Sequence, residues 1–413
     1  MSSPEATDLN GDGVLDVVVG TSDGVIATDG GDGEVLWTSD RQKDVYTSAA
    51  FVDGNADEVD DVVMGGRSND LVMYDGTSGE VLWSLRESQP DLPQSWFGMA
   101  KTVADVDGDG IPEVLVPQSG DDPGTRRDGT LRLVSGADGA QLSAIPTPDG
   151  NEIYSPPEVD ESRPLDEQTL LIGTGGESIP GGVSAIRYAP DGASFATEWS
   201  SPGSGVVAGP ARVRTGSGAE QILTTSWNGP VRMLDQDGNQ VWASQTDGLS
   251  SAAQPVVLPG TDDTQSSVVA VLVEGDTFPP HGSNSVVMWF DAETGETQRT
   301  VELDGFSGSD PVLYDLDDDG SQELLVTPVD TDEAGIPTSR LVALDGATGE
   351  EIAGVAFAGF AVSTPLIADL DGDGLAELVH ADGAAMTCYH LNAPVEPNAV
   401  VRSYQGPKGP ETT

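Results

Sequence analysis

The sequence predicts an all-β fold, a single closed β-propeller that most simply has eight four-stranded blades, with seven blades as the alternative. Two observations predict it. A short acidic loop recurs along the chain, and each copy leads into an apolar segment. Between the loops lie further short apolar segments separated by Gly and Asp/Asn turns, four to a repeat of about 45–55 residues. No segment with helical periodicity is long enough to compete.

The first acidic loop, residues 8–16, has the composition of a calcium site. Asp8, Asn10, Asp12 and Asp16 place oxygen side chains around a tight turn, and Val14 offers its carbonyl. Calcium takes about six to eight oxygen ligands, which a short Asp/Asn-rich loop can supply. In an EF-hand the closing acid stands later in the loop and helices flank it. Here an apolar, strand-like segment follows at once, so the loop is not an EF-hand.

The loop recurs four more times with the same spacing and a following apolar segment. One copy could arise by chance in an acidic chain, but five matched copies indicate a repeat architecture. The candidate calcium ligands of the other loops are Asp53, Asn55, Asp57, Val59 and Asp61; Asp105, Asp107, Asp109, Ile111 and Glu113; Asp315, Asp317, Asp319, Ser321 and Glu323; and Asp369, Asp371, Asp373, Leu375 and Glu377. We therefore expect Ca²⁺ as the cofactor, at about five sites.

The long interval between the third and fourth loops fits three repeats that have lost the loop. In one of them, Arg212 and Arg214 stand where ligands are expected, so we predict that the fifth blade holds no metal. Residues 399–404 could supply the outer strand of the last blade. The predicted blades span residues 1–44, 45–95, 96–149, 150–203, 204–248, 249–304, 305–358 and 359–404, and residues 405–413 form a flexible tail.

Several repeats end in a segment of the Gly-Glu-Val-Leu-Trp kind, which places Trp37, Trp83 and Trp242 on the expected fourth strands. Because these tryptophans recur with the period of the blades, we interpret them as packing between neighbouring blades rather than as a surface for a ligand.

The acidic loops, of the form Asp-x-Asp-Gly-Asp-Gly-x-x-Glu, resemble those of the FG-GAP/VCBS repeats of integrin-type propellers. The Gly-Glu-Val-Leu-Trp turns are similar to those of quinoprotein (PQQ-like) propellers. The resemblance covers roughly residues 4–391 and implies a propeller that binds calcium. It implies little about activity, because one fold carries many functions.

The composition is strongly acidic, with 17 Lys and Arg against 70 Asp and Glu and a formal net charge of −53. Such a surface repels nucleic acid and anionic lipid. The scarcity of lysine and the even spread of acids suggest a halophilic source. The single Cys388 can form no intrachain disulfide.

No apolar run is long enough to span a membrane, and Met1–Ala6 is neither basic nor hydrophobic. We therefore expect that a leader was removed or that the chain is exported by another route. Because calcium loops are most useful where calcium is abundant, we expect an extracellular, cell-surface or virion-surface location.

In a four-stranded blade the acidic loops lie on one face, and the loops between strands 2 and 3 and between blades lie on the other. That second face varies, with long insertions at residues 117–127, 274–281 and 328–336. Loops on a rigid scaffold commonly bind ligands, although aromatic residues here could instead fill gaps between blades. The candidate ligand-face residues are Tyr46, Trp96, Phe97, Arg126, Arg127, Tyr154, Phe278, His281, Phe306 and Phe360.

Two functions follow. The first is a non-enzymatic recognition or adhesion module that binds a protein or glycan partner through this face, without nucleic acid or membrane insertion, as a part of some larger surface assembly. The alternative is a propeller enzyme, either a quinone-dependent dehydrogenase or a polysaccharide lyase. A quinoprotein resemblance implies adjacent cysteines, yet Cys388 stands alone, and His281, His380 and His390 are scattered. We therefore predict no catalytic residues.

Overall fold

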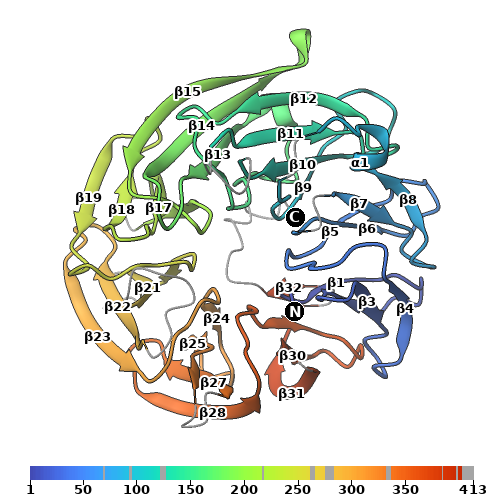
Figure 1. The fold of residues 1–413 in the computed structure, drawn as a ribbon. Helices are drawn as coiled ribbons and strands as arrows, with labels where there is room; N and C mark the ends of the chain where they lie inside the picture. The colour runs from blue at the N-terminus through green and yellow to red at the C-terminus, as the bar shows by residue number, and fades with distance from the viewer. Residues whose placement is uncertain are drawn as a thin grey trace.

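The strands of the chain form eight antiparallel sheets arranged as the blades of a closed ring (Figure 1). The structure, a computed structural model, describes residues 1–67, 70–92, 95–120, 127–215, 218–260, 266–274, 283–331, 336–383, 385–396 and 399–401. The prediction of an all-β single propeller with eight blades is confirmed. Within the described ranges, no helix is both long enough and apolar enough to cross a membrane.

The blades follow one another along the chain, and in most of them the strands run in order from the centre of the ring to its rim; β26 of blade 7 and β32 of blade 8 are the exceptions (Figure 1). Their strands are β1 (Glu5–Thr7), β2 (Asp16–Gly20), β3 (Val25–Thr28) and β4 (Val35–Ser39) in blade 1; β5 (Ala50–Val52), β6 (Asp61–Met64), β7 (Val72–Tyr74) and β8 (Val81–Ser84), followed by α1 (Leu85–Ser88), in blade 2; β9 (Lys101–Val103), β10 (Glu113–Gln118), β11 (Thr130–Val134) and β12 (Gln141–Pro146) in blade 3; β13 (Thr169–Thr174), β14 (Gly181–Ala189) and β15 (Ser194–Gly203) in blade 4; β16 (Ala211–Arg214), β17 (Glu220–Thr224), β18 (Val231–Leu234) and β19 (Gln240–Ser244) in blade 5; β20 (Val256–Leu258), β21 (Ser267–Val273), β22 (Ser285–Asp291) and β23 (Thr297–Leu303) in blade 6; β24 (Val312–Tyr314), β25 (Glu323–Val326), β26 (Val329–Thr331), β27 (Pro337–Asp345) and β28 (Glu351–Ala358) in blade 7; and β29 (Leu366–Ala368), β30 (Leu375–Ala381), β31 (Met386–Pro394) and β32 (Val400–Val401) in blade 8. Short 3-10 turns lie at Leu165–Glu167 and Pro190–Gly192 in blade 4.

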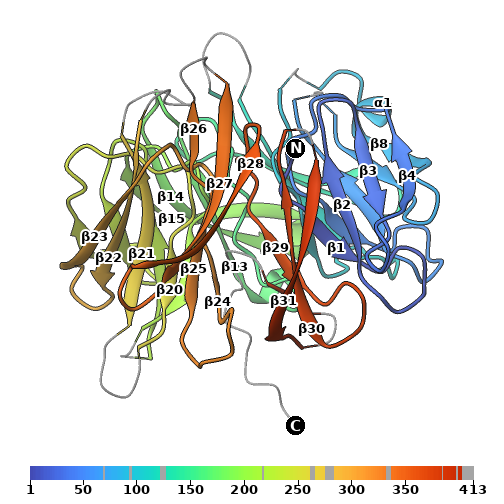
Figure 2. The same cartoon turned by 90° about the horizontal axis from the view of Figure 1, so that it is seen from below.

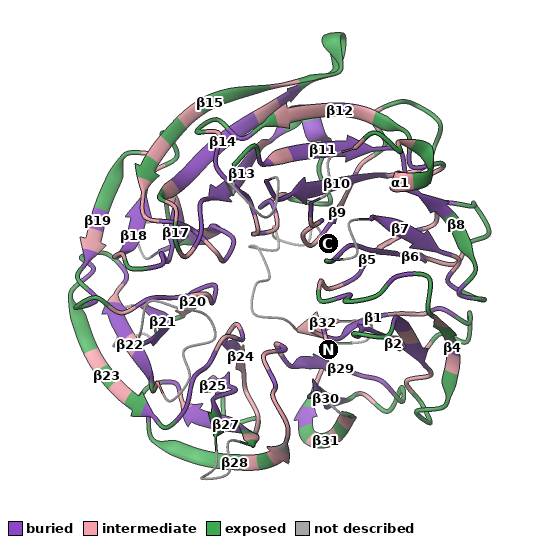
Figure 3. Ribbon diagram, viewed as in Figure 1, coloured by how far each residue is buried: buried purple, intermediate pink, exposed green. Residues whose placement is uncertain are grey.

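The second strand of each blade is apolar because both of its faces are covered by neighbouring blades. Every residue of β2, β6 and β10 is buried, whereas the outer strands β4 and β8 each include exposed positions (Figure 3). The hydrophobic clusters join adjacent blades, so each pair of sheets shares a core.

The repeated tryptophans contribute to these shared cores, as the sequence predicted. The indole Nε1 of Trp37 donates to the carbonyl of Gly76 in the next blade, at 2.6 Å, and Trp83 donates to Gly136 at 2.8 Å. Trp242 donates in the same way to Ala292. Trp199 and Trp289, which the sequence pattern did not single out, make the equivalent bonds to Gln236 and Gly346.

Blades 4, 7 and 8 depart from the regular pattern. Blade 7 has a fifth strand, β26, which pairs with β27. In blade 4 a single bridge between Glu158 and Leu171 stands in place of a regular inner strand. In blade 8 the prediction of an outer strand at residues 399–404 is wrong. Val400–Val401 instead pairs with Ile367 and Ala368 of β29, the innermost strand. The reason is hydrophobic, because Val400 and Val401 pack against apolar clusters that blade 8 shares with blades 1 and 7.

The ring closes between blades 8 and 1. Leu15 and Val17 of blade 1 share a cluster with Leu366 and Val379 of blade 8. The backbone N–H of Thr364 donates to the hydroxyl of Ser3 at 2.9 Å. Segments from the two ends of the sequence therefore hold the ring together directly.

Candidate metal loops and candidate binding face

The five acidic loops connect the first and second strands of blades 1, 2, 3, 7 and 8, as the sequence predicted. They lie on one face of the ring. Figure 2 shows the β24–β25 loop on that face and β26, from the insertion after β25, on the opposite face.

Each loop is closed by a buried carboxylate held in the same way. The carboxylates of Asp16, Asp61, Glu113, Glu323 and Glu377 accept the backbone N–H of the second loop residue: Leu9, Gly54, Val106, Leu316 and Leu370, at 2.9, 2.9, 2.9, 2.7 and 2.8 Å. The first aspartate of each loop accepts the N–H of the sixth residue, so Asp8 binds Gly13 and Asp105 binds Gly110, both at 2.9 Å. These bonds hold the loop carboxylates around a common centre.

Three of the loops bring carboxylate oxygens to within 4.8 Å of one another. The groups are Asp105, Asp107 and Glu113; Asp315, Asp317 and Glu323; and Asp369, Asp371 and Asp373. In the first two blades an asparagine, Asn10 or Asn55, takes the third position, and its side-chain oxygen accepts the N–H of Asp12 or Asp57. The oxygen donors of these loops suit a hard divalent cation.

Burial makes four of the closing acids, those of blades 1, 2, 3 and 7, reluctant to ionise without such a cation. It raises the pKa of Asp16 and Asp61 to about 6 and that of Glu113 to about 7, mainly by desolvation, and it raises the pKa of Glu323 as well. In blade 8 the buried Oδ1 of Asp369 has no hydrogen-bond partner among the described residues. A bound cation would stabilise the ionised form of these buried acids and would give the Asp369 oxygen a partner. The loop residues therefore fit a metal.

The loop of blade 8 has one donor that the sequence did not predict. His390, on β31, places Nδ1 3.0 Å from Glu377 Oε1 and 3.9 Å from Asp371 Oδ2. Because His390 lies well beyond the loop in sequence, only the pairing of β30 with β31 brings it to this site.

In blade 5 ion pairs occupy the place of ligands. Arg212 contacts Glu220 at 3.2 Å and Glu158 at 4.0 Å, and Arg214 contacts Glu220 at 3.7 Å. The positive charges that the sequence placed at ligand positions are thus neutralised by acids of blades 4 and 5.

On the opposite face, three of the predicted ligand-face aromatics gather around an arginine. The guanidinium of Arg67 lies 4.2 Å from the ring centre of Trp96 and 5.7 Å from that of Tyr46. The rings of Trp96 and Tyr154 are 6.1 Å apart, and the Tyr154 hydroxyl donates to Glu152 at 2.6 Å. We call Tyr46, Arg67, Trp96 and Tyr154 the aromatic cluster. It spans the loops of blades 1 to 4.

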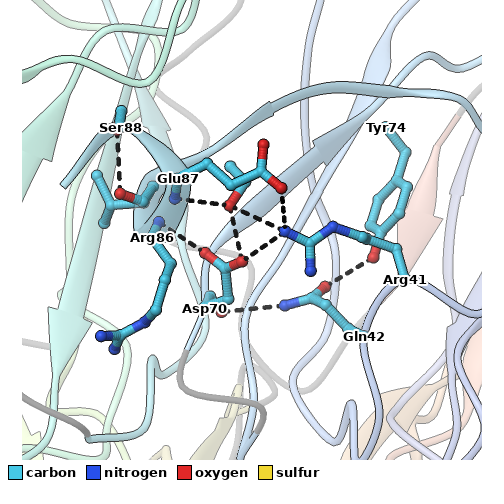
Figure 4. Close-up of polar contacts among 9 residues, drawn as sticks. Arg41, Gln42, Asp70, Tyr74, Arg86, Glu87 and Ser88 are labelled. Carbon is cyan, nitrogen blue, oxygen red and sulfur yellow. Dashed lines mark hydrogen bonds and ion pairs between the residues drawn. The ribbon is translucent and has the colours of Figure 1, made fainter. Parts of the chain in front are cut away.

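A partly buried polar network holds the loops that carry this cluster (Figure 4). Arg41 reaches Asp70 at 3.4 Å and Glu87 at 2.8 Å. Gln42 accepts from the Tyr74 hydroxyl at 2.9 Å and donates to the Asp70 carbonyl at 3.0 Å. The network therefore ties the segment before Tyr46 to the segment after Arg67.

The other residues predicted for the ligand face do not join the aromatic cluster. Phe97 and Phe306 are buried, so their assignment to the ligand face is wrong. Each makes a backbone bridge to a neighbouring segment, and its phenyl side chain packs into a hydrophobic core cluster instead of facing solvent. Arg127 is exposed and Phe360 is half-buried. Arg126, Phe278 and His281 lie outside the described residues. Arg67 was missed, although an arginine in so acidic a chain is itself a signal.

Comparison with known proteins supports the fold. A family model for the FAM234A/B beta-propeller matches residues 23–153. A search of curated proteins found no match.

Solved structures resemble the chain over most of its length. BamB from Moraxella catarrhalis is 16% identical with a TM-score of 0.55, over 94% of this chain and 95% of that one. A europium-containing methanol dehydrogenase is 13% identical with a TM-score of 0.60, over 89% and 80%. A quinohemoprotein alcohol dehydrogenase from Comamonas testosteroni is 15% identical with a TM-score of 0.59, over 96% and 74%. At such identities the likeness concerns the fold alone, and the chain is accordingly a single eight-bladed β-propeller.

Proposed function

We propose that the chain is a non-enzymatic recognition propeller that binds a protein or glycan through the aromatic cluster, with its acidic loops holding calcium on the opposite face. The observation that carries the proposal is the position of the Arg67 guanidinium over the rings of Trp96 and Tyr46. Tryptophan, tyrosine and arginine dominate the binding energy of protein interfaces, and aromatic rings also stack on sugars. Such a cluster on loops of a rigid ring suits recognition.

Calcium has a structural part in this proposal. The five loops would hold it through their side-chain oxygens and the carbonyls of Val14, Val59, Ile111, Ser321 and Leu375. The ion would supply charge neutralisation around the buried closing acids. A source in a salty, calcium-rich setting, at an extracellular, cell or virion surface, accords with the charge of −53.

A glycan array at high salt, followed by titration of any hit, tests the binding face. We expect Trp96→Ala and Arg67→Gln each to weaken binding at least tenfold, because each removes one side of the stack. Arg187→Gln is the matched control, since Arg187 pairs with Glu198 at 2.6 Å on blade 4, away from the cluster. Equal losses in all three variants would show that net charge, and not the cluster, governs binding.

A quinone-dependent dehydrogenase is the second candidate, because two of the similar structures are dehydrogenases. Turnover of a dye-linked alcohol after addition of the quinone, abolished by omission of the quinone, would favour that function over recognition. Cys388 lies exposed on β31, on the outer part of blade 8. It is therefore not placed to clamp a cofactor at the centre of the ring.

A further inference from the structure

One contact recurs at the boundaries between blades. A tryptophan of one blade lies flat against a glycine in the turn between the third and fourth strands of the next blade. A Cβ atom added to Gly79 would lie 2.6 Å from the ring of Trp37, and one added to Gly139 would lie 2.7 Å from the ring of Trp83. Gly238 and Gly295 meet Trp199 and Trp242 in the same way, and Gly349 lies beside Trp289. At four boundaries the indole is the group nearest the glycine, whereas Gly349 first meets Val301 and Arg299 and lies 3.3 Å from Trp289. Indole hydrogen bonds cross all five of these boundaries.

Blade 1 carries the same glycine turn, but no residue that the structure describes covers it. Gly33 has φ +74°, and its N–H donates to the carbonyl of Asp29 at 2.9 Å. Gly79 in blade 2 has φ +71° and the equivalent bond to Asp75, at 2.8 Å. Yet a Cβ added to Gly33 would meet no described atom within 4 Å. The turn therefore has the same backbone conformation as the turn that receives Trp37, but the described part of the preceding blade places no ring against it.

The preceding blade is blade 8, in which the described residues place no strand outside β31. Within the described residues, β31 pairs with β30 alone, because β32 has moved to the inner edge. The rim in Figure 1 is formed by β4, β8, β12, β15, β19, β23 and β28, and it is left to β31 in blade 8. Exposed residues recur along β31, as they do along those outer strands. An unpaired edge of this kind can accept another strand.

No tryptophan within the sequence remains to fill the place over Gly33. The chain has seven tryptophans. Five form the boundary contacts, Trp96 belongs to the aromatic cluster, and Trp227 is buried with Val273 and Phe306. An indole over Gly33 must therefore come from another polypeptide.

We infer that the rim between blades 8 and 1, formed by β31 and Gly33, binds an extended segment of a partner protein that pairs antiparallel with β31 and lays a tryptophan on Gly33. The segment adds the boundary between blades 8 and 1 to those that an indole already crosses. The chain's own outer strands show the pattern that fits, Val35-Leu36-Trp37 in β4 and Val81-Leu82-Trp83 in β8. Main-chain pairing supplies affinity and the side-chain contact supplies specificity.

The charges around Gly33 indicate which residues the partner segment carries beside its tryptophan. Asp32 and Glu34 flank Gly33, and both are exposed. On a chain with a net charge of −53, they favour a segment with lysine or arginine close to its tryptophan. The partner segment is thus apolar, tryptophan-bearing and basic.

A labelled peptide with the sequence of Ser78–Arg86, which contains Trp83 and ends in arginine, is the direct probe. Fluorescence anisotropy with the full chain should show saturable one-to-one binding. The peptide with alanine in place of its tryptophan should bind at least tenfold more weakly. Equal affinity of the two peptides, or no binding of either, would overturn the inference.

Variants of the protein locate the site. Gly33→Asn places a side chain where the ring would lie, and asparagine tolerates a positive φ; it should weaken the peptide at least tenfold. Gly150→Asn is the matched control, because Gly150 has φ +69° and equally open surroundings. A comparison of the two melting temperatures guards against a folding defect.

Two further experiments test which surface binds the peptide and whether the natural partner is another protein or a second copy of this chain. Trp96→Ala should leave peptide binding unchanged, because the peptide binds at the rim and not at the aromatic cluster. The two proposed sites are thus tested independently. A concentration-dependent dimer in sedimentation that Gly33→Asn abolishes would assign the rim to a second copy and contradict the inference of a partner protein.

Discussion

At the residue scale, His380 is a buried histidine, and its burial disfavours the protonated, charged form of the imidazole. It is only 1% exposed, and its ring stacks on Phe357 with centroids 4.4 Å apart. Burial lowers its pKa from 6.5 to about 4, opposed weakly by the charge of Asp382. Its Nε2 has no hydrogen-bond partner among the described residues. The folded chain therefore holds His380 neutral where an unfolded chain would protonate it.

This difference predicts a loss of stability in acid. Between pH 6.5 and about 4 the unfolded state binds a proton at this site and the folded state does not. The free energy of unfolding should thus fall by up to about 1.4 kcal/mol per pH unit across that window, through this group alone. His380→Phe keeps the stacking and removes the titration, so wild type minus variant should show this slope in urea unfolding. A difference that stays flat with pH would mean that His380 is protonated in the fold. Taking the difference is necessary because the raised pKa values of Asp16, Asp61, Glu113 and Glu323 act in the opposite direction.

The fates of individual ligand-face residues show what a sequence can and cannot predict at this scale. Trp96, Tyr46 and Tyr154 were predicted on one face and do come together there. Phe97 and Phe306 occupy similar connections but point inward. Loop position follows from the order of strands, whereas the direction of a loop side chain depends on bridges to neighbouring loops that no local pattern records.

At the element scale, the indole–glycine contact predicts a cost for loss of one indole hydrogen bond. Trp83→Phe keeps an aromatic ring against Gly139 but leaves the buried carbonyl of Gly136 without its donor. We expect a loss of about 1–3 kcal/mol in the free energy of unfolding. Trp96→Phe is the control, since Trp96 is half-buried on the binding face and should change stability by less than about 0.5 kcal/mol. Denaturant titration measures both; similar losses would show that ring size, and not the bond, matters.

The strands themselves were largely predictable, because each acidic loop leads into a fully apolar segment and each turn ends in a recognisable glycine. The last strand was not. Residues 399–404 have the composition of any short strand, and their choice of the inner edge depends on apolar clusters built by blades 1 and 7. His390 was missed for a related reason, since only the register of β30 with β31 places it beside Glu377.

At the scale of the whole molecule, the ring gathers buried acids on one face of an already acidic chain. Five closing carboxylates are at most 3% exposed, and each lies among other acids of its loop. Their mutual repulsion opposes folding in the absence of counter-charge. Cations bound to the loops would turn this repulsion into attraction at five blades at once, which ties the stability of the whole ring to the supply of metal.

Calcium removal is therefore expected to lower the melting temperature of the whole chain, because each site saturated a thousandfold above its dissociation constant stabilises the fold by about 4 kcal/mol. Glu113→Gln removes one closing charge and should reduce the gap between the melting temperatures in calcium and in chelator. Glu58→Gln removes an equal charge from an exposed, non-ligand position of the second loop and should leave that gap unchanged. An anomalous difference map should show metal in blades 1, 2, 3, 7 and 8 and none beside Arg212 in blade 5. Identical melting in calcium and in chelator would contradict the calcium sites, and the acidic loops would then be held by their backbone hydrogen bonds alone.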